Sequence, residues 1–235
     1  MLRLLLISSS SVYGTGYLDH CEDQIKALFT SCDASRILFV PYALFNREYY
    51  AEKAGARFAQ MGLVLESIHT AKSVISAVQE AEAIFIGGGN TFRLLKTLYD
   101  LNLLDPIRQR VLSGMPYMGT SAGSIIATPT IMTTNDMPIV YPPSFASLDL
   151  VPFQINSHYL DPDPDSTHMG ETRDTRLLEY HEENHLPVVA IREGAMLEVE
   201  DSKITVVGTT GGKLFRPGED PLECPQGTRI DQLID

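Results

Sequence analysis

The sequence has few cysteines, a shortage of basic side chains and no long apolar run. Its three cysteines, Cys21, Cys32 and Cys224, are odd in number and far apart. This spacing argues against a disulfide framework and favours free thiols, which are typical of a reducing compartment. We therefore expect a cytoplasmic protein.

Basic residues are outnumbered by acidic ones. The chain has 18 Lys and Arg against 30 Asp and Glu, which gives a formal charge of −12 at pH 7. Because non-specific nucleic-acid binding needs clustered Lys and Arg, we expect no nucleic-acid partner. An anionic ligand would have to find a local positive group.

Long apolar segments are missing too. No stretch approaches the roughly 20 apolar residues that cross a bilayer, so we expect no membrane association. The N-terminal MLRLLLISSSS contains an apolar run that is too short for an export signal. Residues 2–7 are better interpreted as a buried strand.

Short aliphatic runs alternate with segments of helical periodicity through the first half of the chain. The runs do not alternate apolar with polar residues, which is typical of strands buried on both faces of a parallel sheet. We expect strands near residues 2–7, 37–43, 62–68, 83–89 and 115–119, and helices near 17–29, 49–61, 73–81, 91–99 and 106–112. This order predicts a single α/β domain, residues 1–235, whose three layers are a mostly parallel sheet and helices on both of its faces.

The second half is interrupted by prolines. Two short strands are predicted there, VPFQI ending at Ile155 and PVVAI ending at Ile191. The segments MLEVE and KITVVG beyond Gly194 predict an antiparallel finish, with a glycine-rich turn at Gly211 and Gly212.

Ser121 lies in GTSAG, which fits the G-x-S-x-G pattern. In this pattern a strand ends in a sharp turn with the serine at its apex, and a helix follows. Small neighbours let the strand and the helix approach each other closely. A strand-to-helix turn without chemical function fits the same five residues, but the predicted strand before Ser121 favours a nucleophile.

A serine nucleophile needs a base, and the base needs an orienting partner. His158 follows the predicted strand VPFQI and should lie at a carboxyl edge, where open α/β sheets build their sites. Glu193 follows the strand PVVAI, and Asp136 is its rival as the orienting acid. The order Ser, His, Glu differs from that of α/β-hydrolases.

The glycine run Gly87, Gly88 and Gly89 also follows a strand and precedes a helix. A phosphate cradle would need a G-x-G-x-x-G spacing or a Walker lysine, and the run has neither. We expect the N–H groups of Gly89 and Ala122 to form an oxyanion hole instead.

Six segments resemble the peptidase E family of α-aspartyl dipeptidases, in the same order along the chain. They are IFIGGGNTFRLLK, GTSAG, TTNDMPIV, LDLVPFQINSHY, GETRDTR and REG, and they span residues 84–194. The resemblance implies a fold like that of class I glutamine amidotransferases, which is flavodoxin-like, with a serine in place of the cysteine nucleophile. It also implies hydrolysis of dipeptides with an N-terminal aspartate, without a metal or other cofactor.

Carried over by position, the resemblance implies Ser121 as nucleophile, His158 as base and Glu193 as orienting acid, with Asp136 still open for that last role. It places Arg173 near the substrate, where a guanidinium suits a planar carboxylate. Asn90 is a second candidate for substrate binding.

One departure from the family concerns Thr120, because the bacterial enzymes carry a tryptophan before the serine. This difference affects the expected shape of the pocket. Two alternatives stay open: a related hydrolase that acts on polymeric or modified aspartyl peptides, and a non-catalytic binding protein of the same fold. The sequence is also compatible with a homodimer.

Overall fold

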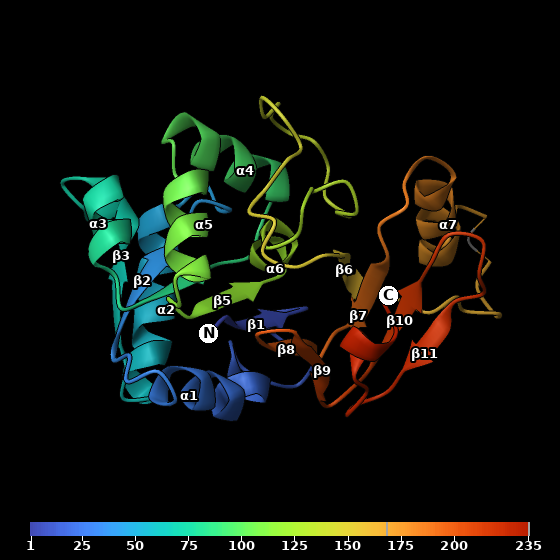
Figure 1. Ribbon diagram of the computed structural model, residues 1–235, viewed down its shortest axis with the longest axis horizontal. Coiled ribbons are helices and arrows are strands. Elements are labelled where there is room, and N and C mark those ends of the chain that lie inside the picture. The colour runs from blue at the N-terminus through green and yellow to red at the C-terminus, as the bar shows by residue number, and fades with distance from the viewer. Residues whose placement is uncertain (168, 235) are drawn as a thin grey trace.

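The computed structural model describes residues 1–167 and 169–234. In these residues the strands form a 7-stranded and a 4-stranded sheet (Figure 1). The larger sheet contains, in spatial order, β3 (Val64–Ser67), β2 (Arg36–Val40), β4 (Ala83–Ile86), β5 (Tyr117–Thr120), β1 (Arg3–Ile7), β8 (Ala195–Glu200) and β9 (Lys203–Gly208). The smaller contains β11 (Leu222–Cys224), β10 (Gly212–Phe215), β7 (Val188–Arg192) and β6 (Gln154–Tyr159).

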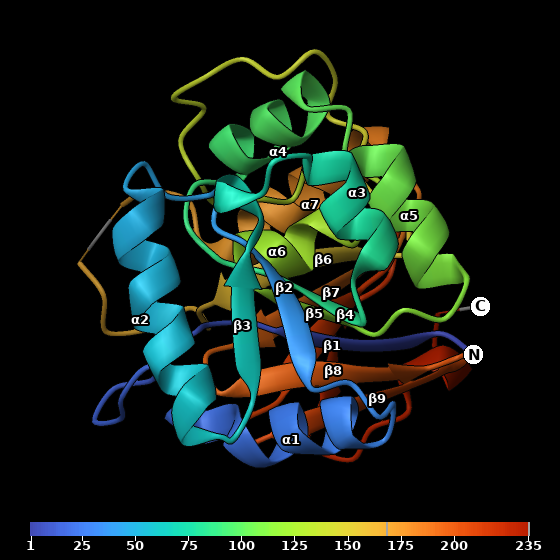
Figure 2. The same ribbon diagram turned by 90° about the vertical axis from the view of Figure 1, so that its left-hand side faces the viewer.

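Helices cover both faces of the larger sheet. The α-helices are α1 (Glu22–Thr30), α2 (Arg47–Gln60), α3 (Val74–Glu80), α4 (Thr91–Asp100), α5 (Leu104–Leu112), α6 (Ala122–Ile126) and α7 (Arg173–Glu183). Short 3₁₀ helices are η1 (Asp19–Cys21), η2 (Ile68–Thr70) and η3 (Ile230–Gln232). Figure 2 shows α1 and α2 on one side of the strands, and α3, α4 and α5 on the other.

The alternation of side chains along each strand explains the unbroken aliphatic runs. In β1, Leu5 and Ile7 pack in the cluster that contains Ile25 and Phe58 of α1 and α2. The intervening Leu4 and Leu6 pack in the cluster on the opposite face, with α3, α4, α5 and α6. Both faces of the strand are therefore buried, as the sequence predicts.

Strands β3, β2, β4, β5 and β1 are parallel, whereas β8 and β9 join the same sheet in antiparallel orientation. The predicted α/β architecture and the antiparallel finish are confirmed. Because β4, β5 and β1 are neighbours, the segments that follow them meet at one edge of the sheet. That edge carries the glycine run and Ser121.

The smaller sheet corrects the prediction of one continuous sheet. Strands β6 and β7 pair in parallel with each other, and β7 pairs in antiparallel orientation with β10. Gly212 starts β10 rather than lying in a turn. Figure 1 shows this sheet and α7 at the end of the molecule opposite β3 and α3.

The boundaries of β6 also differ from the prediction. The strand runs from Gln154 through His158 to Tyr159, whereas the sequence predicts its end at Ile155. Pro152 has no N–H for a sheet ladder, which delays the start of the strand. The polar residue Asn156 continues it in a buried position because its amide donates to the carbonyl of Thr133 at 2.8 Å.

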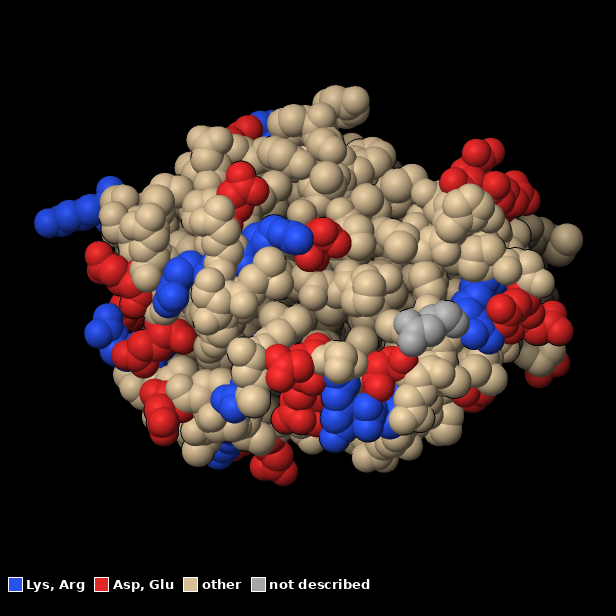
Figure 3. Space-filling view, in the orientation of Figure 1, with Lys and Arg blue, Asp and Glu red and all other residues tan. Residues whose placement is uncertain are grey.

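Cys21, Cys32 and Cys224 are unpaired. Across the described residues, no helix is both long enough and apolar enough to cross a bilayer. On the face drawn in Figure 3, basic side chains mostly lie beside acidic ones rather than in an extended basic patch.

Candidate active site

Ser121 lies at a sharp turn between β5 and α6. Its backbone has φ 50° and ψ −110°, a sparsely populated conformation that costs about 1–3 kcal/mol. A Cβ added to Gly123 would lie 2.1 Å from the carbonyl oxygen of Ile86, and one added to Gly119 would lie 2.6 Å from the carbonyl carbon of Gly123. Both glycines of the motif therefore have the steric role that the pattern predicts.

Ser121, His158 and Glu193 form a hydrogen-bonded chain. The Oγ of Ser121 lies 2.8 Å from Nε2 of His158, and Nδ1 of His158 lies 3.0 Å from Oε1 of Glu193. With the proton on Nδ1, the imidazole donates to the carboxylate and leaves Nε2 free to accept the proton of the serine. The side chains of His158 and Glu193 are 39% and 47% exposed, so a substrate can reach them.

The three residues come from two sheets. Ser121 follows β5 of the larger sheet, whereas His158 lies in β6 and Glu193 directly follows β7, both of the smaller sheet. The prediction that all three follow strands of one sheet is therefore wrong. What places them together is the meeting of the two sheets at their carboxyl edges.

Asp136 contacts the start of α4 and not His158, for which it was the rival orienting acid. Its carboxylate accepts from the N–H of Thr91 at 2.7 Å and from the Thr91 hydroxyl at 2.6 Å. A carboxylate is favourable at this position because the first turn of α4 presents unpaired N–H groups. Asp136 therefore anchors the start of α4, and the carboxylate on His158 is that of Glu193.

Two main-chain N–H groups flank the serine. Ala122 is the first residue of α6, and Gly89 has φ 135° at the end of the glycine run. Within the described part of the chain, neither N–H donates a hydrogen bond. A Cβ on Gly88 would lie 3.1 Å from Cβ of Ser121, so the glycine run lies directly against Ser121. The arrangement suits an oxyanion.

Asn90 does not point its amide into open space. Its Oδ1 accepts from the N–H of Arg93 at 3.0 Å and caps α4. Its Nδ2 donates to the carbonyl of Met137 at 2.9 Å. The side chain predicted to bind substrate thus holds the loop after Asp136 against α4.

A pocket of about 500 Å³ lies between the segment that follows β6 and the start of α7. It is lined by Leu160, Asn135 and Arg173, together with residues of the loop before α7. The amide of Asn135 donates to the carbonyl of Ser157 at 2.7 Å, which ties the pocket wall to β6. Asn135 was not singled out from the sequence, although it directly precedes Asp136 in a segment shared with the family.

Arg173, the first residue of α7, is partly buried in this pocket. Burial, and then the nearby charge of Arg176, lowers the pKa of its guanidinium. Among the described residues Arg173 has neither an ion pair nor a hydrogen-bonded acceptor, whereas Arg176 pairs with Glu171 at 3.4 Å. His168, which the sequence places in a polar segment, lies outside the described residues.

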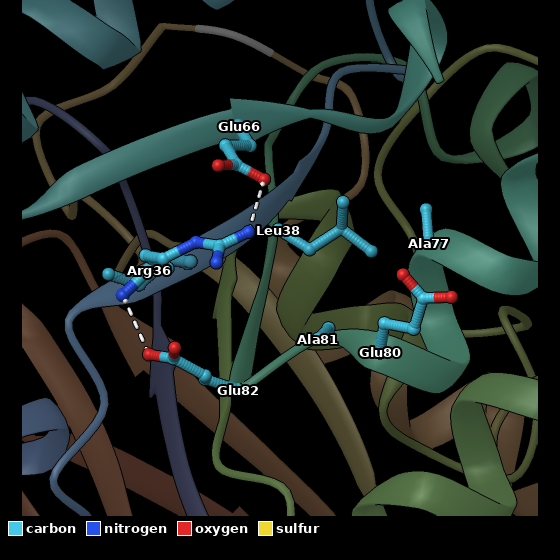
Figure 4. A pocket seen from close by; sticks show the side chains of 8 residues that line it. Arg36, Leu38, Glu66, Ala77, Glu80, Ala81 and Glu82 are labelled. Atoms are coloured by element: carbon cyan, nitrogen blue, oxygen red, sulfur yellow. Dashed lines mark hydrogen bonds and ion pairs between the residues drawn. The ribbon is translucent and has the colours of Figure 1, made fainter. Parts of the chain in front are cut away.

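A second hollow, of about 170 Å³, lies at the opposite edge of the sheet (Figure 4). There the backbone N–H of Arg36 donates to Glu82 at 3.0 Å, and its guanidinium pairs with Glu66 at 3.3 Å. Arg36 begins β2, so this hollow is at the amino ends of the strands, away from Ser121. In the residues that the structure covers, no group of three or more His, Cys, Asp or Glu could hold a metal ion.

Comparison with known proteins identifies the family. The model of peptidase family S51 matches residues 4–207. The chain belongs to peptidase family S51. This membership confirms the resemblance found in the sequence.

Among S51 relatives, the peptidase E of Streptomyces coelicolor is 45% identical over 234 residues, covering 100% of this chain and 96% of its own length. A probable alpha-aspartyl dipeptidase of Drosophila melanogaster is 50% identical over 215 residues, covering 91% and 90%. A solved structure of a peptidase from an acI-B1 Actinobacterium aligns with a TM-score of 0.71 at 18% identity, covering 97% and 96%. The flavodoxin-like fold expected for the family is thereby confirmed.

Proposed function

We propose that this S51 peptidase is a serine-type dipeptidase that hydrolyses Asp-X dipeptides through an acyl-enzyme. The dipeptidase class agrees with the family and with the names of relatives at 45% and 50% identity. The observation that carries the mechanism is the chain of hydrogen bonds from Ser121 through His158 to Glu193. The three free cysteines suit a cytoplasmic enzyme.

In the first half of the reaction, the Oγ of Ser121 attacks the carbonyl carbon of the N-terminal aspartate. His158 Nε2 takes the hydroxyl proton, and Glu193 stabilises the imidazolium. The proton then passes to the leaving amine as the peptide bond breaks. In the second half, His158 activates a water molecule that releases aspartate from Ser121.

The developing oxyanion would lie between the N–H groups of Gly89 and Ala122. Preorganised donors of this kind act only when charge develops on the carbonyl oxygen, so they stabilise the transition state more than the substrate. Asp136 and Asn90 contribute indirectly, because both hold the start of α4 directly after Gly89.

Arg173 supplies the preference for aspartate in this proposal. A partly buried guanidinium without an acidic partner among the described residues offers two parallel N–H donors to a carboxylate. The pocket that it lines also includes Leu160, two residues after His158, and Asn135, whose amide donates to the carbonyl of Ser157 at 2.7 Å. In a chain with a net charge of −12, this local cation is what an acidic substrate requires.

The test is a panel of Asp-Leu, Asn-Leu, Glu-Leu, Ala-Leu and an isoaspartyl peptide. The wild type should prefer Asp-Leu, and Ser121→Ala should lower kcat by about 10⁴ to 10⁶. Arg173→Met should lower kcat/KM for Asp-Leu by about 10²-fold and leave Ala-Leu little changed, because only the acidic substrate loses its partner. The matched control is Arg176→Met, which removes a guanidinium of the same pocket that already pairs with Glu171.

Retention of more than a few per cent of activity by Ser121→Ala would rule out the assigned nucleophile. A wild type that prefers the isoaspartyl peptide would instead favour the related hydrolase of modified aspartyl peptides. An equal loss on Asp-Leu and Ala-Leu in Arg173→Met would remove Arg173 from substrate recognition while leaving the hydrolytic residues untouched.

A further inference from the structure

Ser8, the residue directly after β1, connects the two sheets where the hydrolytic residues meet. Its side chain is fully buried. The hydroxyl donates to the carbonyl of Ile191 at 2.8 Å and accepts from the backbone N–H of His158 at 2.9 Å. The backbone N–H of Ser8 donates to the carbonyl of Ala195 at 3.1 Å. One residue at the end of β1 thus contacts β6 and the chain on both sides of Glu193.

The backbone of His158 explains why its N–H needs this partner. The pairing of β6 with β7 shifts register between Ser157 and Tyr159, so His158 is the extra residue of a bulge. Its φ is 55°, in the left-handed region that residues with a side chain adopt only at an energetic cost. Because a bulged residue leaves the ladder, its N–H requires an acceptor outside the sheet, and the Ser8 hydroxyl is that acceptor.

The preceding residue holds the nucleophile. The carbonyl of Ile7 accepts from the N–H of Ser121 at 2.9 Å and from the hydroxyl of Ser124 at 2.7 Å. Consecutive residues at the end of β1 therefore fix the main chain of Ser121 and that of His158. The separation between the hydroxyl and the imidazole depends on both anchors.

We propose that Ser8 is a positioning residue of the hydrolytic site. Its hydroxyl holds His158 in the left-handed conformation that brings Nε2 within 2.8 Å of the Oγ of Ser121. This inference rests on the proposed function, in which His158 is the base. Ser8 acts through His158, because its hydroxyl is occupied by two main-chain groups.

The decisive variants are Ser8→Ala and Ser8→Thr. Ser8→Ala should lower kcat for Asp-Leu by about 10²-fold, because a small misplacement of the base is costly, and should leave KM unchanged. Ser8→Thr keeps the hydroxyl and should recover most of that loss. The matched control is Ser9→Ala. Ser9 is also buried, but its hydroxyl donates to the carbonyl of Ser11 in its own loop.

A second measurement does not require the dipeptidase reaction. Labelling of Ser121 by a fluorophosphonate depends on the same hydroxyl and base, so Ser8→Ala should slow the labelling rate by about the same factor as kcat. If Ser8→Ala does not fold, Ser8→Cys, which has a weaker acceptor of similar size, should be slower than Ser8→Thr.

The inference is overturned if folded Ser8→Ala has wild-type kcat and labelling rate, or if Ser8→Thr is no better than Ser8→Ala or Ser8→Cys. Failure of the proposed function would look different. In that case Ser121→Ala and His158→Ala would themselves keep activity, whereas failure of the Ser8 inference alone leaves both of them inactive.

Discussion

At the scale of single residues, Glu193 and Asp136 show how position decides the role of a carboxylate. Glu193 is 47% exposed and lies 3.0 Å from the imidazole of His158. Asp136 accepts two hydrogen bonds from Thr91 at the start of α4. The first carboxylate can stabilise a charge that appears during the reaction, whereas the second stabilises a helix end.

Neutralising each carboxylate should separate these roles. Glu193→Gln should lower kcat by about 10² to 10⁴-fold with little change in stability, because the imidazolium loses its counter-charge. Asp136→Asn should lower the free energy of unfolding by about 1–3 kcal/mol, because it weakens two hydrogen bonds at a helix N-terminus, and should reduce kcat far less. Dipeptide kinetics and urea unfolding of both variants measure the loss of kcat and the loss of stability separately. The reverse pattern would make Asp136 the acid that supports His158.

The positions of site residues are predictable where a residue follows an apolar strand. Ser121 and Glu193 were found in this way, as was His158 near its strand's predicted end. Ser8 follows β1 in the same manner, yet its role depends on a bulge in β6, a strand about 150 positions away along the chain. The choice between Glu193 and Asp136 was open for a similar reason, because spacing does not show which carboxylate reaches the imidazole.

At the scale of elements, close packing between β4, β5 and α6 makes the turn at Ser121 intolerant of larger residues. Gly123 in α6 and Gly55 in α2 form a contrasting pair. A Cβ on Gly123 would meet the carbonyl oxygen of Ile86 at 2.1 Å, whereas a Cβ on Gly55 would meet nothing within 4 Å. Both glycines lie in helices. Because only Gly123 is crowded, the same substitution should have opposite consequences at the two positions.

Gly123→Ala should destabilise the fold by about 1–3 kcal/mol through overpacking and should abolish most activity, because the turn at Ser121 must shift. Gly55→Ala should stabilise the fold by about 0.5–1 kcal/mol, because alanine is the better helix former, and should leave kcat unchanged. Thermal unfolding and Asp-Leu turnover test both expectations. Unchanged stability and turnover in Gly123→Ala would contradict the close packing of α6 against β4.

Elements were predictable in proportion to their apolar content. The sequence predicts the five parallel strands and their helices from short apolar runs, even though β3, at the edge of the sheet, is the least buried of these strands. Helix α7 was not predicted, since Leu177 is the one residue it buries among those described. Strands β10 and β11 have only 4 and 3 residues and gave no periodic signal.

At the scale of the whole molecule, a charged network spans the smaller sheet. The carboxylate of Asp161, just beyond β6, accepts a hydrogen bond from Nε of Arg192 in β7 at 2.6 Å. It also lies 3.0 Å from Nζ of Lys213 on β10. Arg192 also pairs with Glu223 on β11 at 2.5 Å. The hydrogen bond from Arg192 lowers the pKa of Asp161 most. Burial opposes this shift, but a further hydrogen bond from Lys213 helps to hold the pKa well below its ordinary value.

This lowered pKa links stability to pH. The unfolded chain takes up a proton at Asp161 near pH 4, whereas the folded chain resists protonation to lower pH. The contribution of Asp161 is therefore complete above about pH 4 and is lost as the pH falls further. Between pH 5 and pH 3, the urea midpoint of Asp161→Asn should fall less than that of the wild type.

The control for this measurement is Asp220→Asn. Asp220 is exposed and has no ion pair within the described part of the chain. Its variant should follow the wild type at every pH. Identical slopes for Asp161→Asn and the wild type would show that the network contributes nothing to acid stability.

The sequence does not predict how the strands divide between the two sheets. Strands β6 and β7 have the same apolar character as those of the larger sheet, with buried residues such as Ile155, Val189 and Ile191. Composition shows that a strand is buried but does not show which neighbour pairs with it. The family resemblance predicts the fold class, whereas the site depends on how the two sheets meet.

The split between the sheets has a consequence for how the enzyme fails. The proposed nucleophile follows a strand of one sheet and the imidazole lies in the other, and the Ser8 hydroxyl forms hydrogen bonds across the junction between them. Turnover therefore depends on the relative position of the two sheets. A shift of the smaller sheet by about 1 Å would separate the imidazole from the hydroxyl and abolish most activity. The larger sheet, with helices on both faces, would keep its fold.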